Sequence, residues 1–200
     1  MYATTYHRPS SLAEAGSLIA ANGEGKILAG GQTLLPTMKQ RLAAPSDLVD
    51  IGRLAELKTI QVTGDAVIIG AGVKHADVNT SADVNRAIPA LAKLAGGIGD
   101  PAVRAMGTIG GSVANNDPAA DYPSAVLGLG ATIHTNKRTI AADAYFQGMF
   151  ATALEDGEII KAISFPIPAK AAYAKFPNPA SRYAMCGVFV AKMKDGSVRV

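Results

Sequence analysis

The chain has 200 residues, of which 48% are hydrophobic, 18% charged and 6% aromatic, and its formal net charge is +3. No apolar run approaches the roughly 18–20 residues of a membrane span, and the scattered basic residues disfavour nucleic acid as a partner. The single cysteine, Cys186, excludes an internal disulfide or a cysteine-ligated iron–sulfur cluster within the chain. With no secretory signal at the start, it favours a reducing cytoplasm.

The first fifty residues predict a small α/β unit. Ser11 and Glu14 have the spacing of a capping box, and the apolar residues after them repeat at helical intervals as far as Asn22–Gly23. One further helix over 34–42 and two short strands over 26–29 and 47–51 are predicted to follow.

The rest of the chain predicts antiparallel strands mixed with helices. The expected elements are a hairpin of 59–62 with 66–69, helical segments over 76–93, a turn-rich segment over 96–108, a strand over 125–134, a short helix over 142–146 and a strand over 158–165. After residue 170, strands over 185–192 and 198–200 flank a Lys194-Asp195-Gly196 turn. We therefore expect units of residues 1–56 and 57–169, and the start of a truncated C-terminal domain over 170–200.

A glycine-rich turn joins the first predicted strand to the second predicted helix. It reads Ala29-Gly30-Gly31-Gln32-Thr33 and is called the first glycine loop below. At a helix start, free backbone N–H groups and the helix dipole attract an anion, and paired glycines let the backbone approach a ligand closely. Thr33 can cap the helix or bind a phosphate oxygen. An ordinary strand-to-helix turn with glycine at a positive φ accounts for the same residues.

A second loop repeats this chemistry. It reads Gly107-Thr108-Ile109-Gly110-Gly111-Ser112 and is called the second glycine loop. Asp121, shortly after it, can accept hydrogen bonds from ribose hydroxyls or an adenine amino group, although a turn with helix caps is the plainer explanation. Asp117 and Asp121 lack a nearby histidine, so no metal site is predicted. Neither the Rossmann pattern nor the P-loop pattern is present, whereas two separate loops suit a diphosphate held from both sides.

Three segments carry a family resemblance: AGGQTLLPTMKQRLAAPSDLVDI, GDPAVRAMGTIGGSVANNDPAADYP and YAKFPNPASRYAMCGV. In this order they resemble the FAD-binding medium subunit of the molybdenum hydroxylases, the group that includes aerobic carbon monoxide dehydrogenase and xanthine dehydrogenase. The resemblance implies an α+β fold of the vanillyl-alcohol-oxidase/PCMH-like type, with two α/β subdomains that bind FAD and a C-terminal domain that is largely absent from this chain.

Carried over by position, the resemblance implies FAD contacts at Ala29, Gly30, Gly31, Gln32, Thr33, Ile98, Gly99, Thr108, Gly110, Gly111, Asp121, Ile160, Lys175 and Tyr183. The two glycine loops and Ile98–Gly99 meet the diphosphate, Asp121 the adenosine side and Ile160 the adenine. Lys175 lies near the flavin and Tyr183 covers the isoalloxazine ring. The plainer alternatives are a solvated strand end for Lys175 and a core position for Tyr183. With glutamine and not histidine at position 32, we expect noncovalent FAD.

The implied function is electron transfer within a complex. A large partner subunit bears molybdopterin and a small one bears iron–sulfur clusters, in a dimer of heterotrimers, and FAD passes the electrons to an external acceptor. No catalytic residue is nominated in this chain, because the cofactor supplies the chemistry. The alternatives are a self-sufficient FAD-dependent oxidase and a cofactor-free structural subunit. The three histidines lack metal-ligand spacing, and Cys186 is expected to be a buried, inert thiol.

Overall fold

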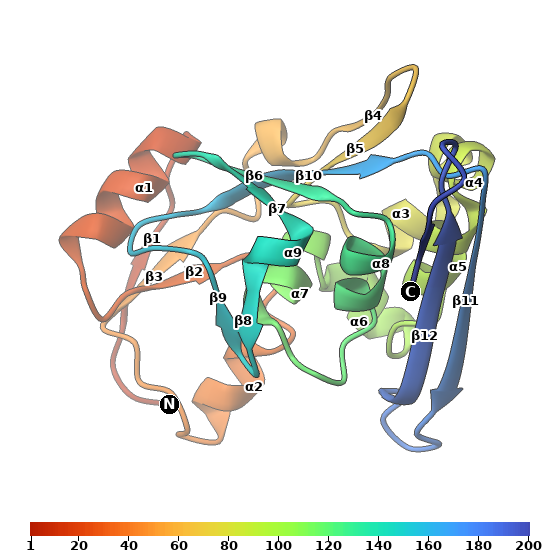
Figure 1. Ribbon diagram of the computed structural model, residues 1–200. Coiled ribbons are helices and arrows are strands. Elements are labelled where there is room, and N and C mark those ends of the chain that lie inside the picture. The colour runs from red at the N-terminus through yellow and green to blue at the C-terminus, as the bar shows by residue number, and fades with distance from the viewer.

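A computed structural model describes residues 1–200, and three sheets organise the larger part of it (Figure 1). The first sheet has the strand order β1-β3-β2, and both strand pairs are parallel. Its region comprises β1 (Thr5–His7), α1 (Leu12–Ala21), β2 (Lys26–Leu28), α2 (Leu34–Lys39) and β3 (Asp47–Asp50). The Ser11 hydroxyl accepts a hydrogen bond from Glu14 N at 3.2 Å, which confirms the predicted start of α1.

The second sheet is antiparallel throughout, in the order β4-β5-β10-β6-β7, and runs across the top of the view in Figure 1. Its region comprises η1 (Ala55–Leu57), β4 (Ile60–Val62), β5 (Ala66–Gly70), α3 (His75–Thr80), α4 (Ala82–Ala87), α5 (Pro89–Gly96), α6 (Pro101–Met106), α7 (Ile109–Asn115), α8 (Tyr122–Gly128), β6 (Thr132–Thr135), β7 (Thr139–Ala141), α9 (Ala142–Tyr145), β8 (Phe146–Gly148), β9 (Ala151–Thr152) and β10 (Ile160–Pro166). The predicted hairpin of β4 and β5 and the strand β10 are confirmed.

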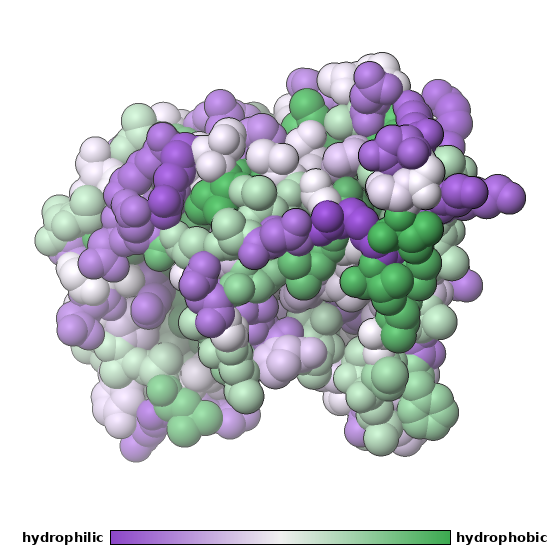
Figure 2. All heavy atoms as spheres, in the orientation of Figure 1, coloured by the Kyte–Doolittle hydropathy of each residue, from purple (hydrophilic) through white to green (hydrophobic).

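The third sheet consists of β11 (Lys170–Pro177), β12 (Ala184–Lys192) and β13 (Val198–Arg199), paired antiparallel in that order. The predicted pairing of β12 with β13 is confirmed by the Lys192–Val198 register. Tyr173 and Phe189 are buried in the same hydrophobic core as the second sheet and its helices. The opposite face of β12 is exposed, and Figure 2 shows apolar atoms gathered there and at the C-terminal residue.

Three predictions were wrong. The expected strand over 125–134 is a helix, α8, followed by the short strand β6, because a short apolar run does not distinguish a buried helix from a buried strand. The turn-rich segment contains α6, which Asp100 caps by accepting a hydrogen bond from Val103 N at 2.8 Å. Cys186 is exposed, since it lies on the uncovered face of β12. None of the helices is long and apolar enough to span a bilayer.

Candidate cofactor-binding cleft

One cavity of about 970 Å³ lies between the first sheet, the segment from α6 to α8 and the turn that joins β11 to β12. Figure 2 shows the surface hollowed at its lower edge, between α2 and that turn. The cavity is lined by thirteen of the fourteen residues that the sequence nominates: Ala29, Gly30, Gly31, Gln32, Thr33, Ile98, Gly99, Thr108, Gly110, Gly111, Asp121, Ile160 and Tyr183. The fourteenth, Lys175, does not line this cavity; it lines a smaller neighbouring pocket, and its ammonium contacts Asp121. The volume falls within the range of about 300–1,000 Å³ that is usual for ligand sites.

The first glycine loop connects β2 to α2 and presents its backbone to the cavity. Five consecutive N–H groups, those of residues 30–34, donate a hydrogen bond to no other group of the protein. Gly31 has φ +69°, which favours glycine, and the Thr33 hydroxyl makes no capping bond to α2. Free N–H groups at a helix start, beside an unused hydroxyl, form a site for an anionic oxygen.

The second glycine loop leads into α7, and most of its N–H groups are already used. Gly110 N donates to the Ala71 carbonyl at 2.9 Å, and Gly111 N donates to the Thr108 hydroxyl at 3.2 Å. A Cβ on Gly110 would lie 2.5 Å from Ala71 Cβ, so packing alone demands glycine there. A Cβ on Gly111 would meet only Thr108 Oγ1, at 3.0 Å. Gly111 therefore leaves space on the cavity side that the protein itself does not fill.

The two glycine loops are neighbours in space although some 75 residues of chain separate them. A Cβ on Gly30 would lie 2.3 Å from the carbonyl oxygen of Met106 and 2.8 Å from Cα of Gly107. Glycine at position 30 thus lets the first loop pack directly on the backbone that enters the second. The sequence-based expectation that both loops face one ligand agrees with this geometry.

Asp121 lies in a buried polar cluster at one end of the cavity. Its carboxylate accepts a hydrogen bond from Tyr173 Oη at 2.6 Å and pairs with Lys175 Nζ at 2.9 Å. Lys175 also donates to the Gly97 carbonyl at 2.9 Å. The family resemblance implies a place for Asp121 on the adenosine side and for Lys175 near the flavin, and in the structure their side chains touch. Because the diphosphate separates the two halves of FAD, this contact favours one half of the cofactor for both residues.

Tyr183 lines the same cavity directly before β12, and about half of the residue is exposed. The pKa of its hydroxyl is raised, mainly by partial burial and to a smaller extent by the nearby carboxylates of Asp117 and Asp121. The ring is thus neither in the core nor fully solvated, and it lies near Asp121.

His75 is a cavity residue that sequence reasoning did not nominate. It is 5% exposed, its ring lies 5.4 Å from the Tyr122 ring, and its Nδ1 has no hydrogen-bond partner. Burial, and secondarily the charge of Arg104, lowers its pKa to about 4, so the imidazole is neutral near pH 7. His75 belongs to no recognisable motif in the sequence, and only the fold brings it beside Gly107.

Charged side chains do not make the cavity basic. Two cationic residues, Lys26 and Arg182, line it, against six acidic ones: Asp100, Asp117, Asp121, Glu155, Asp156 and Glu158. An anionic ligand would therefore be held by backbone N–H groups and hydroxyls near the glycine loops. The acidic residues would face neutral, hydroxyl-rich or amino-bearing parts of the ligand.

Comparison with known proteins agrees with this geometry. Residues 2–168 match the family described as the FAD binding domain in molybdopterin dehydrogenase. The carbon monoxide dehydrogenase medium chain of Hydrogenophaga pseudoflava is 38% identical over 202 residues, which cover 96% of this chain and 70% of that one. The xanthine dehydrogenase FAD-binding subunit of Escherichia coli O157:H7 is 31% identical over 167 residues, covering 81% and 57%.

Solved structures give the same result. The Cu,Mo-CO dehydrogenase in its cyanide-inactivated form superposes with a TM-score of 0.92 at 36% identity, covering 99% of this chain and 73% of that one. Quinoline 2-oxidoreductase from Pseudomonas putida 86 gives 0.90 at 33% identity, covering 94% and 68%. The resemblance noted in the sequence is confirmed. The chain belongs to the family of FAD-binding domains of the molybdopterin dehydrogenases, and it is an oxidoreductase subunit with FAD as its cofactor.

Proposed function

We propose that this chain is the FAD-carrying electron-transfer subunit of a molybdopterin-dependent hydroxylase or dehydrogenase complex. The observation that carries the proposal is the row of five unpaired N–H groups at residues 30–34, facing the same cavity as the open side of Gly111. Backbone donors and an uncrowded glycine fit the diphosphate of FAD.

The chain's own residues would bind and orient the cofactor. The first glycine loop would hold the diphosphate through its N–H groups, and Thr33 and Thr108 would supply hydroxyls beside it. Asp121, Lys175 and Tyr183 stand together, and we assign all three to the flavin half. Lys175 would stabilise negative charge on the reduced ring, and Tyr183 would limit access to it.

When bound, FAD would supply the redox chemistry, taking electrons from iron–sulfur clusters on a small partner subunit and passing them to an external acceptor. A large partner subunit would carry molybdopterin, in a dimer of heterotrimers. The relatives are named as medium chains or FAD-binding subunits, which supports a multi-subunit complex. We further propose the PCMH-like division into residues 1–56 and 57–169, with residues 170–200 beginning a third unit.

The visible absorption spectrum of the purified full chain, mixed with FAD and desalted, tests the binding proposal. A flavin spectrum at about one FAD per chain is expected, and a colourless protein of native secondary structure would overturn it. Purification from the native source tests the assembly: a molybdopterin protein and an iron–sulfur protein should accompany the chain. A catalytically complete single chain would instead favour the self-sufficient oxidase.

A further inference from the structure

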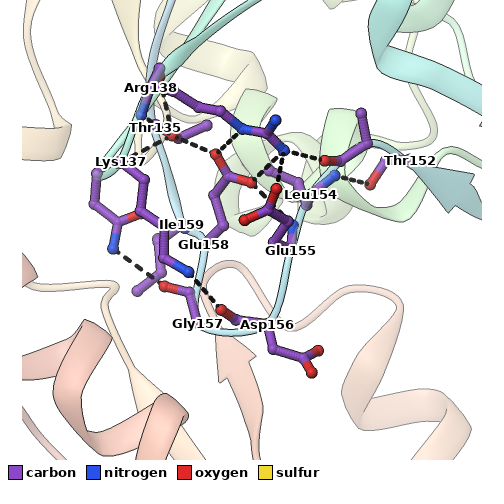
Figure 3. Close-up of polar contacts among 12 residues, drawn as sticks. Thr135, Lys137, Arg138, Thr152, Leu154, Glu155, Asp156, Gly157, Glu158 and Ile159 are labelled. Atoms are coloured by element: carbon purple, nitrogen blue, oxygen red, sulfur yellow. Dashed lines mark hydrogen bonds and ion pairs between the residues drawn. The ribbon is translucent and has the colours of Figure 1, made fainter.

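One wall of the cavity is a loop that makes several polar contacts with a neighbouring turn, and Figure 3 shows these contacts. Residues 154–160 line the cavity, and Figure 3 shows Thr135, Lys137 and Arg138 of the neighbouring turn beside them. Asn136 Nδ2 donates to the Gly157 carbonyl at 3.1 Å, and its Oδ1 accepts from Ile159 N at 2.8 Å. Lys137 Nζ donates to the Asp156 carbonyl at 2.7 Å. Side chains of the turn thus hold the loop chiefly by bonds to the loop's backbone.

Arg138 and Glu158 form the centre of this contact. The guanidinium donates to Glu158 Oε1 from Nε at 3.0 Å and to Oε2 from Nη2 at 3.1 Å, and Nη2 also reaches the Ala153 carbonyl at 2.7 Å. The Glu158 side chain is fully buried and accepts further bonds from Thr135 Oγ1 at 2.7 Å and Glu155 N at 2.9 Å. This fork geometry fixes orientation as well as distance.

The charge of Glu158 is secured by these donors. Burial by itself raises the pKa of the carboxyl, but the bonds from Arg138, the Glu155 backbone and Thr135 outweigh burial and lower the pKa to about 2. Glu158 is therefore ionised at any working pH, and both of its carboxylate oxygens accept hydrogen bonds from groups of the protein. That excludes it as a proton donor to a ligand and leaves a positioning role.

The loop also joins the two parts of the chain that face the cavity. Ile159 is 4% exposed and packs in the small core with Leu12 and Ala15 of α1. A Cβ on Gly157 would lie 3.4 Å from Ala20 Cβ, at the end of the same helix. The Asp156 and Gly157 N–H groups and the Leu154 carbonyl bond to no group of the protein. Fixed in place, such peptide groups can match the donors and acceptors of a base.

We propose that the Arg138–Glu158 pair is a positioning device for the adenosine half of the cofactor: it holds the 154–160 wall in the shape that receives the base, and so makes the site prefer FAD to FMN. The inference rests on the proposed function. Neither residue would touch the reacting ring, and both act through the backbone of the loop.

The test compares Arg138→Met with Arg86→Met in the full chain. Arg86 pairs with Asp83 at 3.5 Å on the surface and is 79% exposed. Arg86→Met therefore makes the same chemical change at a residue that does not contact the 154–160 loop. Dissociation constants for FAD, ADP and FMN are measured by titration below the melting temperature of every variant. Arg138→Met should weaken FAD and ADP by about tenfold or more and FMN by less than about twofold. Arg86→Met should change none of them.

A second variant, Glu158→Gln, keeps the shape of the side chain but removes its charge. It should weaken FAD and ADP more than FMN, as Arg138→Met does. This variant tests the proposal if Arg138→Met does not fold. Equal losses for FAD and FMN, or unchanged FAD and ADP binding in either folded variant, would overturn the positioning role. Wild-type protein that binds no FAD would instead overturn the proposed function. Hydrogen exchange gives an independent readout: residues 153–159 should exchange faster in the variants, and residues 29–33 should not.

Discussion

The Lys175 ammonium lies 2.9 Å from one oxygen of the Asp121 carboxylate and 3.0 Å from the other. Asp121 is 4% exposed and the Lys175 side chain 10%, so each is the other's main counter-charge. The pair links the third sheet to the wall of the cavity. Because Asp121 contacts Lys175 and lies near Tyr183, we propose that it serves the flavin half of the cofactor.

Asp121→Asn is therefore expected to weaken FAD and FMN by the same amount, about 1–3 kcal/mol each, since a charge-assisted contact at the flavin half is lost for both ligands. Titrations with the two flavins measure it. Asp65→Asn is the matched control, because Asp65 pairs with Lys194 at 3.0 Å and is 93% exposed, where such pairs contribute little. A loss confined to FAD would return Asp121 to the adenosine side.

The paired glycines of the second loop should separate into one that packing requires and one that the ligand requires. Gly110→Ala should lower the free energy of unfolding by about 1–3 kcal/mol, because its Cβ would overlap Ala71. Gly111→Ala should change it by no more than about 1 kcal/mol, since helix propensity offsets the tight contact with Thr108. Thermal melts without ligand check both. The reverse order of stabilities would contradict this explanation of the loop.

His75 should make the stability of the fold depend on pH. Its pKa falls from 6.5 to about 4 on folding, so below pH 6.5 the unfolded chain binds a proton that the folded chain does not. Between pH 6.5 and pH 4 the free energy of unfolding should therefore decrease by about 3 kcal/mol more in wild type than in His75→Gln. Denaturant titrations across this range give the difference. Parallel pH profiles of the two proteins would show that His75 is not held neutral.

Several features of the fold followed from local chemistry. The Ser11 cap, the β4–β5 hairpin and the β12–β13 hairpin depend on neighbours in sequence, and each was predictable. The helix α8 was not, because the short apolar run from Ala125 to His134 spans the end of a helix and a strand, and such a run does not by itself distinguish the two. The start of α6 could have been predicted, because Asp100 is a typical N-cap residue and Pro101 is favoured at the first helical position. The glycines around it instead suggested turns.

The site divides in the same way. The glycine loops were recognisable because glycine pairs beside a hydroxyl are local patterns. The contact of Asp121 with Lys175 spans 54 residues, and that of Arg138 with Glu158 spans 20. Neither pair has a local sequence signature, since the partners meet only after the sheets have formed. Asp121 and Lys175 could therefore each be nominated from the sequence, but not their contact with one another, and Arg138 and Glu158 were missed entirely.

FAD should be released intact by acid. No histidine or cysteine lies in the first glycine loop, where Gln32 Nε2 approaches only the Gly30 carbonyl, at 3.5 Å. Precipitation of the FAD-loaded protein with trichloroacetic acid should leave all flavin absorbance in the supernatant and a white pellet. Yellow colour that stays with the washed pellet would mean a covalent link.

The central claim is that the two glycine loops hold the diphosphate of FAD between them, and an FAD titration of Gly111→Val tests it most directly. Gly64→Val is the matched control, because a Cβ at Gly64 has no neighbour within 4 Å and lies far along the chain from both loops. Both variants should keep the circular dichroism of the wild type. The account predicts that Gly64→Val binds FAD as wild type does and that Gly111→Val loses about tenfold or more in affinity, since its side chain would enter ligand space. Normal FAD binding by a folded Gly111→Val protein would contradict it.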